Sequence, residues 1–275
     1  MAIRPTTWSA LPGGLTNRLW LCETESGPFV VKLYSRPANP MFDNNAEAEF
    51  RVLNMLKGHG VAPDPIAMTQ SDAGAIVVYH YLPGQHWHTG TSAAADLLRT
   101  LHDISAPQGL SLSSGGSQRI LAQTAAIAEA VGLPIPDPVR HLTDLALALP
   151  PVPATDDPRL IHGDPVVTNI LSTRHGLRLI DWQCPAAGDP CEDIALFLSP
   201  AMQLRGRGQV PTDGEIRCFL SRYAQPDLIG RFIQLRPFYH LRHAVYAWWS
   251  LSQDHGHSPA GMQAEMRAFE SSIGL

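Results

Sequence analysis

Residues 160–193 constrain this chain more than any other stretch, because two polar clusters stand there between short apolar runs. The first cluster places Asp164 two residues after His162 and five residues before Asn169, and the second is centred on Asp181. The apolar runs predict a strand, a tight turn and a second strand that ends at Asp181. We therefore expect Asp164, Asn169 and Asp181 to converge at one end of a small sheet.

An Asp, an Asn and a second Asp at one place supply a proton acceptor and two oxygen ligands for Mg²⁺, which phosphoryl transfer needs. The spacing H-x-D-x-x-x-x-N, followed by an apolar pair and Asp, is the pattern of catalytic and metal-binding loops in kinases. Gly163 stands where protein kinases carry Arg, and the second Asp lies in IDWQ instead of DFG. In this form the stretch resembles the aminoglycoside phosphotransferase and choline kinase family of small-molecule kinases. The alternative is an ordinary loop whose Asp caps a helix.

The composition is that of an ordinary globular protein, since 44% of its 275 residues are hydrophobic, and this length allows one large or two medium domains. A formal charge of -5 provides no basic surface, so neither nucleic acid nor a membrane is an expected partner. The first residues lack an apolar signal core, and no run is long enough to cross a bilayer. The four cysteines have neither metal-ligand nor disulfide-framework spacing. We expect a reduced, cytoplasmic protein, and the sequence predicts no oligomeric state.

Lys32 is one of only two lysines among 20 basic residues, and it lies in an apolar stretch, residues 29–34, that is predicted to be a strand. A lysine in an apolar strand costs free energy unless it is paired or reaches water. The helix predicted over residues 45–56 offers Glu47 and Glu49 as partners. Glu49 lies on the apolar stripe of that helix and Glu47 lies off it, so Glu49 is favoured while Glu47 stays open.

A glycine-rich turn precedes the strand predicted over residues 18–22, which forms a hairpin with the next strand. Gly13 and Gly14 would let backbone N–H groups approach a phosphate closely, with Thr16 and Asn17 as further donors. An ordinary hairpin explains such a turn equally well. The nucleotide-binding interpretation depends on the lysine of the next strand facing the same phosphates.

The resemblance implies an α+β, bilobal protein-kinase-like fold, with a small N-terminal lobe built on an antiparallel β-sheet and a larger, mostly helical C-terminal lobe. Residues 1–82 would form the nucleotide-binding lobe, and residues 83–275 would form the catalytic and substrate-binding lobe.

Residues 66–68 and 75–82 are predicted to form another hairpin, whose second strand runs into a Pro-Gly break. The resemblance places an interlobe hinge there, near His80, Tyr81 and Leu82. It implies that the backbone of His80 and Leu82 holds the adenine of ATP. The sequence alone predicts only a hairpin and a turn.

The resemblance also gives each polar residue a role in phosphoryl transfer, which is mainly positioning and charge neutralisation. Asp164 would accept the proton of the substrate hydroxyl. Asn169 and Asp181 would hold Mg²⁺, and Lys32, steadied by Glu49, would hold the α- and β-phosphates of ATP. The expected cofactors are therefore ATP and Mg²⁺.

Two further residues are expected to support these loops without reacting. His162 would buttress the first loop by hydrogen bonding, because a single His beside a strand is more often structural than catalytic. Asp189, between a glycine and a proline, would accept hydrogen bonds that fix the second loop.

Apolar periodicity predicts helices along the C-terminal part of the chain, separated by Pro- and Gly-rich stretches. In the last predicted helix Tyr246 and Trp249 could surround a quaternary ammonium group by cation–π attraction, and ordinary packing is the alternative. A polar loop is predicted over residues 203–214. The predicted helices cover residues 93–102, 118–130, 138–149, 215–224 and 228–253, with another that begins at residue 194.

Three motifs resemble choline and ethanolamine kinases within the broad family: GGLTNRLW, LIDWQCPAAGDP and the aromatic YAWWSLSQ. They imply a hydroxylated amine such as choline or ethanolamine as the small-molecule partner. Pro165 and Gln183 depart from the usual pattern and leave the substrate open. An aminoglycoside or a thiamine-like compound is the alternative acceptor. A non-catalytic nucleotide-binding regulator is the alternative from another class, although such a module would need no proton acceptor.

Overall fold

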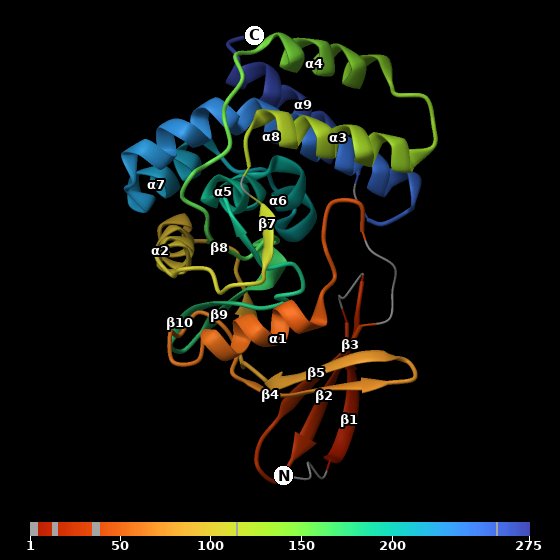
Figure 1. Cartoon of the computed structure of the whole chain (residues 1–275), viewed down its shortest axis with the longest axis vertical. Coiled ribbons are helices and arrows are strands. Elements are labelled where there is room, and N and C mark those ends of the chain that lie inside the picture. Colours follow the sequence, from red (N-terminus) through yellow and green to blue (C-terminus); the bar gives the residue numbers. More distant parts are fainter. Residues whose placement is uncertain (1–4, 13–15, 35–38, 114, 257) are drawn as a thin grey trace.

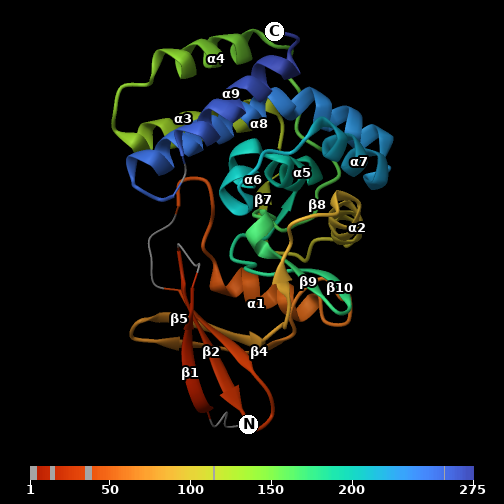
Figure 2. The ribbon, with the colours of Figure 1, turned by 180° about the vertical axis from the view of Figure 1, so that it is seen from behind.

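The computed structural model describes residues 5–12, 16–34, 39–113, 115–256 and 258–275. An antiparallel sheet lies at one end of the molecule and a group of helices at the other, with helix α1 (Ala46–Met55) between them (Figure 1). The reverse view in Figure 2 shows the same arrangement. The α+β class expected from the sequence is confirmed, with the antiparallel sheet in the N-terminal part and most helices in the C-terminal part.

The sheet near the N-terminus has five strands in the order β1-β2-β3-β5-β4, and all neighbours are antiparallel. Its central strand β3 (Phe29–Leu33) carries Lys32, which pairs with Leu19 of β2 and Val77 of β5. Lys32 is fully buried, so its ammonium group needs a partner inside the protein. The other four strands are β1 (Pro5–Leu11), β2 (Arg18–Thr24), β4 (Pro65–Ser71) and β5 (Gly74–His80).

Strand β1 was not predicted from the sequence. The side chains of residues 6–10 are exposed, and Trp8 is 54% exposed. The strand therefore lacks the alternation of apolar and polar residues that identifies a half-buried strand. It forms by backbone pairing along β2, from Pro5 opposite Thr24 to Leu11 opposite Leu19.

Helix α1 confirms the helix predicted over residues 45–56. The Asn45 side chain caps it by accepting a hydrogen bond from the N–H of Ala48 at 3.0 Å. Leu53 and Glu49 lie on its buried face, whereas Glu47 is exposed. The capped helix therefore presents Glu49 to the interior beside the sheet.

Two small sheets carry the stretch that the sequence singled out. In the first, β9 pairs with β10 and with β6, and a 3₁₀ turn over Val167–Asn169 leads directly into β9. In the second, β11 lies between β7 and β8. The strand predicted to end at Asp181 ends two residues earlier. The bounds are β6 (Gln85–His86), β7 (Ser111–Ser113), β8 (Arg159–Ile161), β9 (Ile170–Thr173), β10 (Gly176–Leu179) and β11 (Ala186–Gly188).

The remaining helices form the other end of the molecule, where α3, α4, α8 and α9 lie side by side in both views (Figures 1 and 2). None of the helices in the described ranges is both long enough and apolar enough to cross a membrane. The bounds are α2 (Thr91–His102), α3 (Ser117–Val131), α4 (Asp137–Ala148), α5 (Pro190–Leu198), α6 (Pro200–Arg207), α7 (Asp213–Tyr223), α8 (Pro226–Ser252) and α9 (Pro259–Ser272).

Two of these helices correct the sequence prediction. Helix α6 occupies residues 200–207, part of which was predicted to be a polar loop, and α9 follows the helix that was expected to finish the chain. The second half of α6 is Leu-Arg-Gly-Arg, which has no apolar stripe, so periodicity gives no helical signal there. Its N-terminal cap and its contacts with other elements, described below, supply what the periodicity lacks.

Candidate active site

A cavity of about 280 Å³ lies where the five-stranded sheet faces the helical part. Its lining comes from β2, β5 and β6, the residues between β1 and β2, the segment that precedes α1, the segments that follow β8 and β10, and helices α6 and α8. Asp164, Asn169 and Asp181, which the sequence predicted to converge, all line it. The structure therefore brings the two polar clusters to one place.

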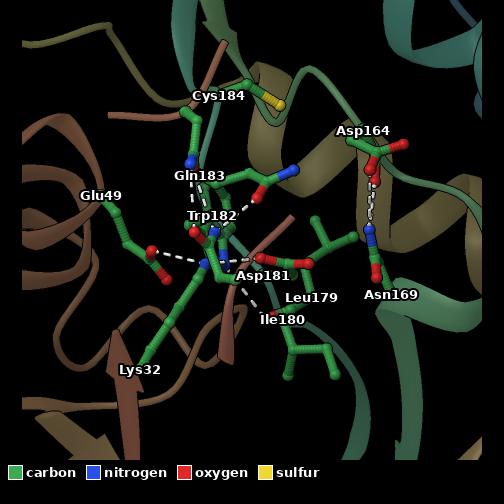
Figure 3. A network of polar contacts seen from close by, with 12 residues as sticks. Lys32, Glu49, Asp164, Asn169, Leu179, Ile180, Asp181, Trp182, Gln183 and Cys184 are labelled. Atoms are coloured by element: carbon green, nitrogen blue, oxygen red, sulfur yellow. Dashed lines mark hydrogen bonds and ion pairs between the residues drawn. The ribbon is translucent and has the colours of Figure 1, made fainter. Parts of the chain in front are cut away.

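Lys32 lies between the carboxylates of Glu49 and Asp181, outside the lining of the cavity (Figure 3). Its Nζ atom is 2.7 Å from Oε2 of Glu49 and 2.5 Å from Oδ1 of Asp181. Burial acts to lower the pKa of Lys32, but the two carboxylates outweigh it, so the pKa is raised and the lysine is charged. Of the two candidate partners, the one that pairs with Lys32 is Glu49.

Asp181 has a backbone conformation that few residues other than glycine adopt, with φ of 62°. The conformation is fixed from both sides. The following residue, Trp182, is fully buried and donates from its ring nitrogen to the carbonyl of Leu179 at 3.0 Å. On the preceding side, the N–H of Ile180 donates to the carbonyl of Asn169 at 2.9 Å. Such a strained residue, held at a cavity, is typical of functional sites.

Asp164 and Asn169 contact each other across the turn that follows β8 (Figure 3). The amide nitrogen of Asn169 donates to the backbone carbonyl of Asp164 at 2.9 Å and to its Oδ2 atom at 3.2 Å. Burial raises the pKa of Asp164 to about 7, and the charge of Asp181 adds to the rise. A carboxyl group with a pKa near neutrality can both accept and release a proton, as a catalytic base must.

His162 connects the two loops. Its Nδ1 atom accepts a hydrogen bond from the N–H of Asp164 at 3.2 Å, so in the neutral ring Nε2 donates to the carbonyl of Ile180 at 3.0 Å. Burial lowers the pKa of His162, which favours the neutral ring that this pattern requires. The residue lies where a buttress for the loop was expected.

Asp189 fixes its own turn and does not contact the catalytic loop. Its carboxylate accepts from the N–H of Cys191 at 3.0 Å, which caps α5, and pairs with Arg231 at 2.8 Å. The acid that holds the loop is Asp193, which is fully buried and accepts from the N–H groups of His162 at 2.8 Å and Gly163 at 2.9 Å. An acid immediately before the apolar run IALFL would have been the signal for it, because a buried carboxylate needs such donors.

Gly163 cannot be replaced without moving the loop that follows Asp181. Its φ is +82°, and a Cβ atom there would lie 2.2 Å from the carbonyl oxygen of Cys184. The two polar clusters are therefore in van der Waals contact at this glycine.

The end of the glycine-rich turn contacts the loop after Asp181. Gly13 and Gly14 lie outside the described residues, and Thr16 lines the cavity. Asn17 is buried and donates to Oε1 of Gln183 at 2.8 Å, and it exchanges hydrogen bonds with Asn44. Gln183 thus fills with a neutral amide the position where the sequence pattern leads one to expect an acid.

The expected hinge residues lie beside the cavity without being part of its lining, which includes Tyr79 instead. The N–H of His80 donates to the carbonyl of Asp64 at 2.9 Å, and the N–H of Tyr81 donates to that of Pro28 at 3.1 Å. These two donors are already used within the protein. An adenine at this position would therefore depend on carbonyl groups or on Leu82.

Tyr246 and Trp249 occupy different layers of the aromatic wall. Tyr246 lines the cavity, meets Phe42 edge to face at 5.4 Å, and accepts a hydrogen bond at its hydroxyl from Asn39 at 2.8 Å. Trp249 is stacked on Tyr246 at 5.4 Å and is not among the lining residues. The ring that a ligand could contact is therefore that of Tyr246.

The residues suit a metal ion that is shared with a ligand. Within the described ranges, no group of three or more His, Cys, Asp or Glu side chains could hold a metal ion on its own. Asn169 uses its amide nitrogen toward Asp164 and so has its oxygen to offer, and Asp181 keeps Oδ2 beside the oxygen bound to Lys32. Two oxygen ligands completed by phosphate oxygens and water are what Mg²⁺ commonly takes in such sites.

Comparison with known proteins agrees with this chemistry. The sequence profile of a family described as "Phosphotransferase enzyme family" matches residues 7–222. A search of curated proteins gave no match.

Among solved structures, a choline/ethanolamine kinase family protein from Mesorhizobium loti has a TM-score of 0.68 at 18% identity, covering 98% of this chain and 88% of its own. Spectinomycin phosphotransferase in complex with ADP and spectinomycin gives 0.66 at 16%, covering 98% and 90%. Choline kinase from Streptococcus pneumoniae gives 0.64 at 18%, covering 99% and 95%. At these identities the likeness shows the fold, which is that of kinases acting on small molecules.

Proposed function

The chain belongs to the phosphotransferase enzyme family, and on that premise we propose that it transfers the γ-phosphate of ATP to a hydroxyl group of a small molecule, with Mg²⁺. The observation that carries the proposal is that Asp164, Asn169 and Asp181 line one cavity, while the buried Lys32–Glu49 pair contacts Asp181 from outside the lining. These are the parts that phosphoryl transfer requires: a base, two metal ligands and a cation for the phosphates. Residues 1–82 would form the nucleotide-binding lobe, and residues 83–275 would form the catalytic lobe.

In this proposal Asp164 orients the acceptor hydroxyl and takes its proton as the oxygen attacks the γ-phosphate. Its amide partner Asn169 fixes the carboxylate at 3.2 Å, and His162 and Asp193 hold the backbone of the same turn. A base fixed in this way needs little rearrangement when the acceptor binds.

Lys32 binds phosphate oxygens of ATP, and Glu49 keeps its ammonium group in place. Asn169 and Asp181 hold Mg²⁺, which when bound neutralises charge on the phosphate oxygens. Lys32 also contacts Asp181 directly.

The acceptor is the finer part of the proposal. The sequence favours a hydroxylated amine such as choline or ethanolamine, and Tyr246 offers one aromatic face to it. The similar structures include a choline/ethanolamine kinase family protein, a choline kinase and a phosphotransferase bound to spectinomycin, with TM-scores of 0.64 to 0.68. Fold likeness therefore does not distinguish an amino alcohol from an aminoglycoside or thiamine-like compound. The residues that line the cavity must decide which acceptor binds.

The function can be tested by replacing the proposed base. We expect Asp164→Ala to lower kcat by about 10²–10⁴-fold while the affinity for a non-hydrolysable ATP analogue stays unchanged, because the base acts on the acceptor only. ATP consumption should be measured with a panel of small alcohols, and nucleotide binding by calorimetry.

Asp144→Ala removes an exposed carboxylate from α4 and is the matched control, which should keep full activity. Full turnover by Asp164→Ala would contradict the assignment of the base. ATP binding by the natural chain without stimulation by any acceptor would favour the non-catalytic regulator instead.

A further inference from the structure

The charged side chains that line the cavity leave one cation without a role. In the described part of the chain the lining contains two acids, Asp164 and Asp181, and one arginine, Arg205. The segments outside the described ranges contain no Asp or Glu. With both acids assigned to the reaction, no lining carboxylate remains for a cationic acceptor, and an exposed guanidinium group faces the cavity.

We propose that Arg205 binds an anionic group of the acceptor, so that the enzyme phosphorylates a hydroxyl on a molecule that also carries a carboxylate or a phosphate ester. A planar guanidinium group binds either anion through paired N–H donors. The proposal rests on the phosphotransferase function and narrows its substrate class. It admits a hydroxylated amine only where the same molecule carries an anion.

Arg205 is held over the catalytic turn by the tight packing of its neighbour. A Cβ atom on Gly206 would lie 1.9 Å from Cγ2 of Val167, which belongs to the turn that ends at Asn169. Only a glycine allows α6 to approach so closely. Met202, Arg205 and Gly206 share one face of α6, and all three line the cavity.

The other end of α6 is anchored by a buried carboxylate from α9. The hydroxyl of Ser199 caps α6 by accepting from the N–H of Met202 at 3.2 Å, and it donates to Oε1 of Glu265. Oε1 of Glu265 also accepts a hydrogen bond from the N–H of Ala201 at 3.0 Å. Glu265 is fully buried and its other oxygen bonds His240 at 2.6 Å. Helix α6 is therefore fixed at both ends, and so is the direction from which Arg205 meets the cavity.

A second arginine on the same turn shows what a structural role looks like. Arg207 pairs with Glu215 at 2.7 Å and lies over the ring of Trp87 at 5.5 Å, with its side chain almost fully buried. Arg205 forms no ion pair with any described residue within 4.0 Å, and it is exposed. Arg207 therefore has an acidic partner within the protein, whereas Arg205 has none among the described residues and is left for a ligand.

The electrostatic neighbours of Arg205 lie on the acceptor side of the cavity. Burial raises the pKa of Asp164 and of Tyr246, and in both cases the charge of Arg205 opposes the rise. Lys32, the cation proposed for the nucleotide phosphates, lies beside Asp181 instead. An anion held by Arg205 would therefore belong to the molecule whose hydroxyl meets Asp164.

The proposal can be tested with pairs of alcohols that differ only by an anionic group. Serine is ethanolamine with a carboxylate, and glycerol 3-phosphate is glycerol with a phosphate ester. The natural chain should prefer the anionic member of at least one pair by about tenfold or more in kcat/KM, as expected for a charge-assisted hydrogen bond. The two pairs distinguish a carboxylate from a phosphate ester as the recognised group.

Variants at one position assign the preference to Arg205. Arg205→Ala should abolish the preference, Arg205→Lys should keep part of it, and Arg205→Glu should reverse it toward ethanolamine. The KM for ATP should stay unchanged in all three. Arg217→Ala removes an exposed arginine of α7 that is outside the cavity lining, and it should leave the preference intact.

Calorimetry with the same four compounds, in the presence of an ATP analogue and Mg²⁺, separates this inference from the proposed function. Tighter binding of an anionic member that Arg205→Ala removes supports the anion site, even if no compound stimulates ATP consumption, and in that case the phosphotransferase function fails alone. Equal binding and equal turnover within both pairs overturn the anion site while leaving the function intact. An Arg205→Ala variant whose only defect is a raised KM for ATP also overturns it.

Discussion

The charged side chains on the two sides of the cleft differ in whether they have partners within the protein. On the sheet side, Lys32 is buried between Glu49 and Asp181, so each charged group already has a partner. On the side of α6, Arg205 is exposed and has no acidic partner among the described residues. In the proposed reaction the paired wall meets ATP, which is the same in every turnover. The unpaired wall meets the acceptor, which differs from one enzyme to another.

The difference follows from the ligand that each side of the cleft would bind in the proposed reaction. In the proposed reaction the phosphates of ATP would replace one partner of Lys32, so this lysine can be paired within the protein. A wall that selects a particular acceptor gains selectivity when its charge is satisfied only by the right ligand, since a wrong ligand then leaves the charge unpaired. Three measurements can break or sharpen this comparison.

The largest effect, a loss of stability, should follow from removing the buried cation Lys32. Lys32→Met leaves the Glu49 carboxylate buried beside Asp181 without a cation, and removing one member of a buried ion pair costs about 3–5 kcal/mol. The free energy of unfolding, measured by urea denaturation, should fall by that amount. Arg222→Ala breaks an exposed pair with Asp96 and is the control, for which water screening predicts little change. An equal loss in both variants would remove the distinction between the walls.

A smaller effect is expected at the aromatic part of the acceptor wall. Tyr246→Phe keeps the ring and removes the hydroxyl that accepts from Asn39 at 2.8 Å. Since this hydrogen bond fixes the ring that lines the cavity, its net worth of about 0.5–1.5 kcal/mol limits the expected rise in the KM of the acceptor to roughly tenfold. Steady-state kinetics with ATP and acceptor varied in turn should show the change for the acceptor alone. A change in the KM for ATP instead would place Tyr246 on the wrong side of the cleft.

The smallest effect is expected at Glu215, the acid that pairs with Arg207. The hydrogen bond from Arg207 lowers the pKa of Glu215 to about 2, against the effect of partial burial. Since the pKa is lower in the folded protein than the unfolded value of about 4.3, the ionised group stabilises the fold above that value. The contribution is lost as the pH falls from about 4.3 toward 2.

Glu215→Gln should therefore lower the free energy of unfolding at pH 7 by about 1 kcal/mol, and its difference from the natural chain should shrink between about pH 5 and pH 3. Urea denaturation at several pH values measures this. Asp137→Asn, which removes an exposed carboxylate on α4, should show no such pH-dependent difference. A gap that stays constant down to pH 3 would mean that the Arg207 contact is not what stabilises Glu215.

The same contrast explains what the sequence could predict. Asp164, Asn169 and Asp181 stand in two short stretches whose order and spacing are dictated by the reaction, and the fold class is what the family resemblance of these stretches implies. The choice of Glu49 over Glu47 needed only the face of one helix, and the ion pair with Lys32 at 2.7 Å is the one that the apolar stripe favours. Local patterns were sufficient wherever the chemistry is local.

Residues whose importance comes from tertiary packing were not predictable in this way. Asp189 has the stronger local signal, because it lies between a glycine and a proline, yet it only caps the start of α5. The acid that binds the catalytic turn is Asp193, one turn further along the same helix. Arg205 lies in a stretch without apolar periodicity, and its place at the cavity depends on a single glycine packing against Val167. The hinge expected at His80 and Leu82 stays a prediction.

The carboxylate of Glu265 gives the last helix of the chain an importance that its position in the sequence conceals. It is the last described acid but one along the chain, yet its oxygens hold the start of α6 and thereby the acceptor wall. Shortening the protein from its C-terminal end should therefore not behave as the trimming of a peripheral tail. A deletion that reaches α9 would alter which molecules the enzyme accepts, whereas Lys32 and its partners on the sheet side would keep their geometry.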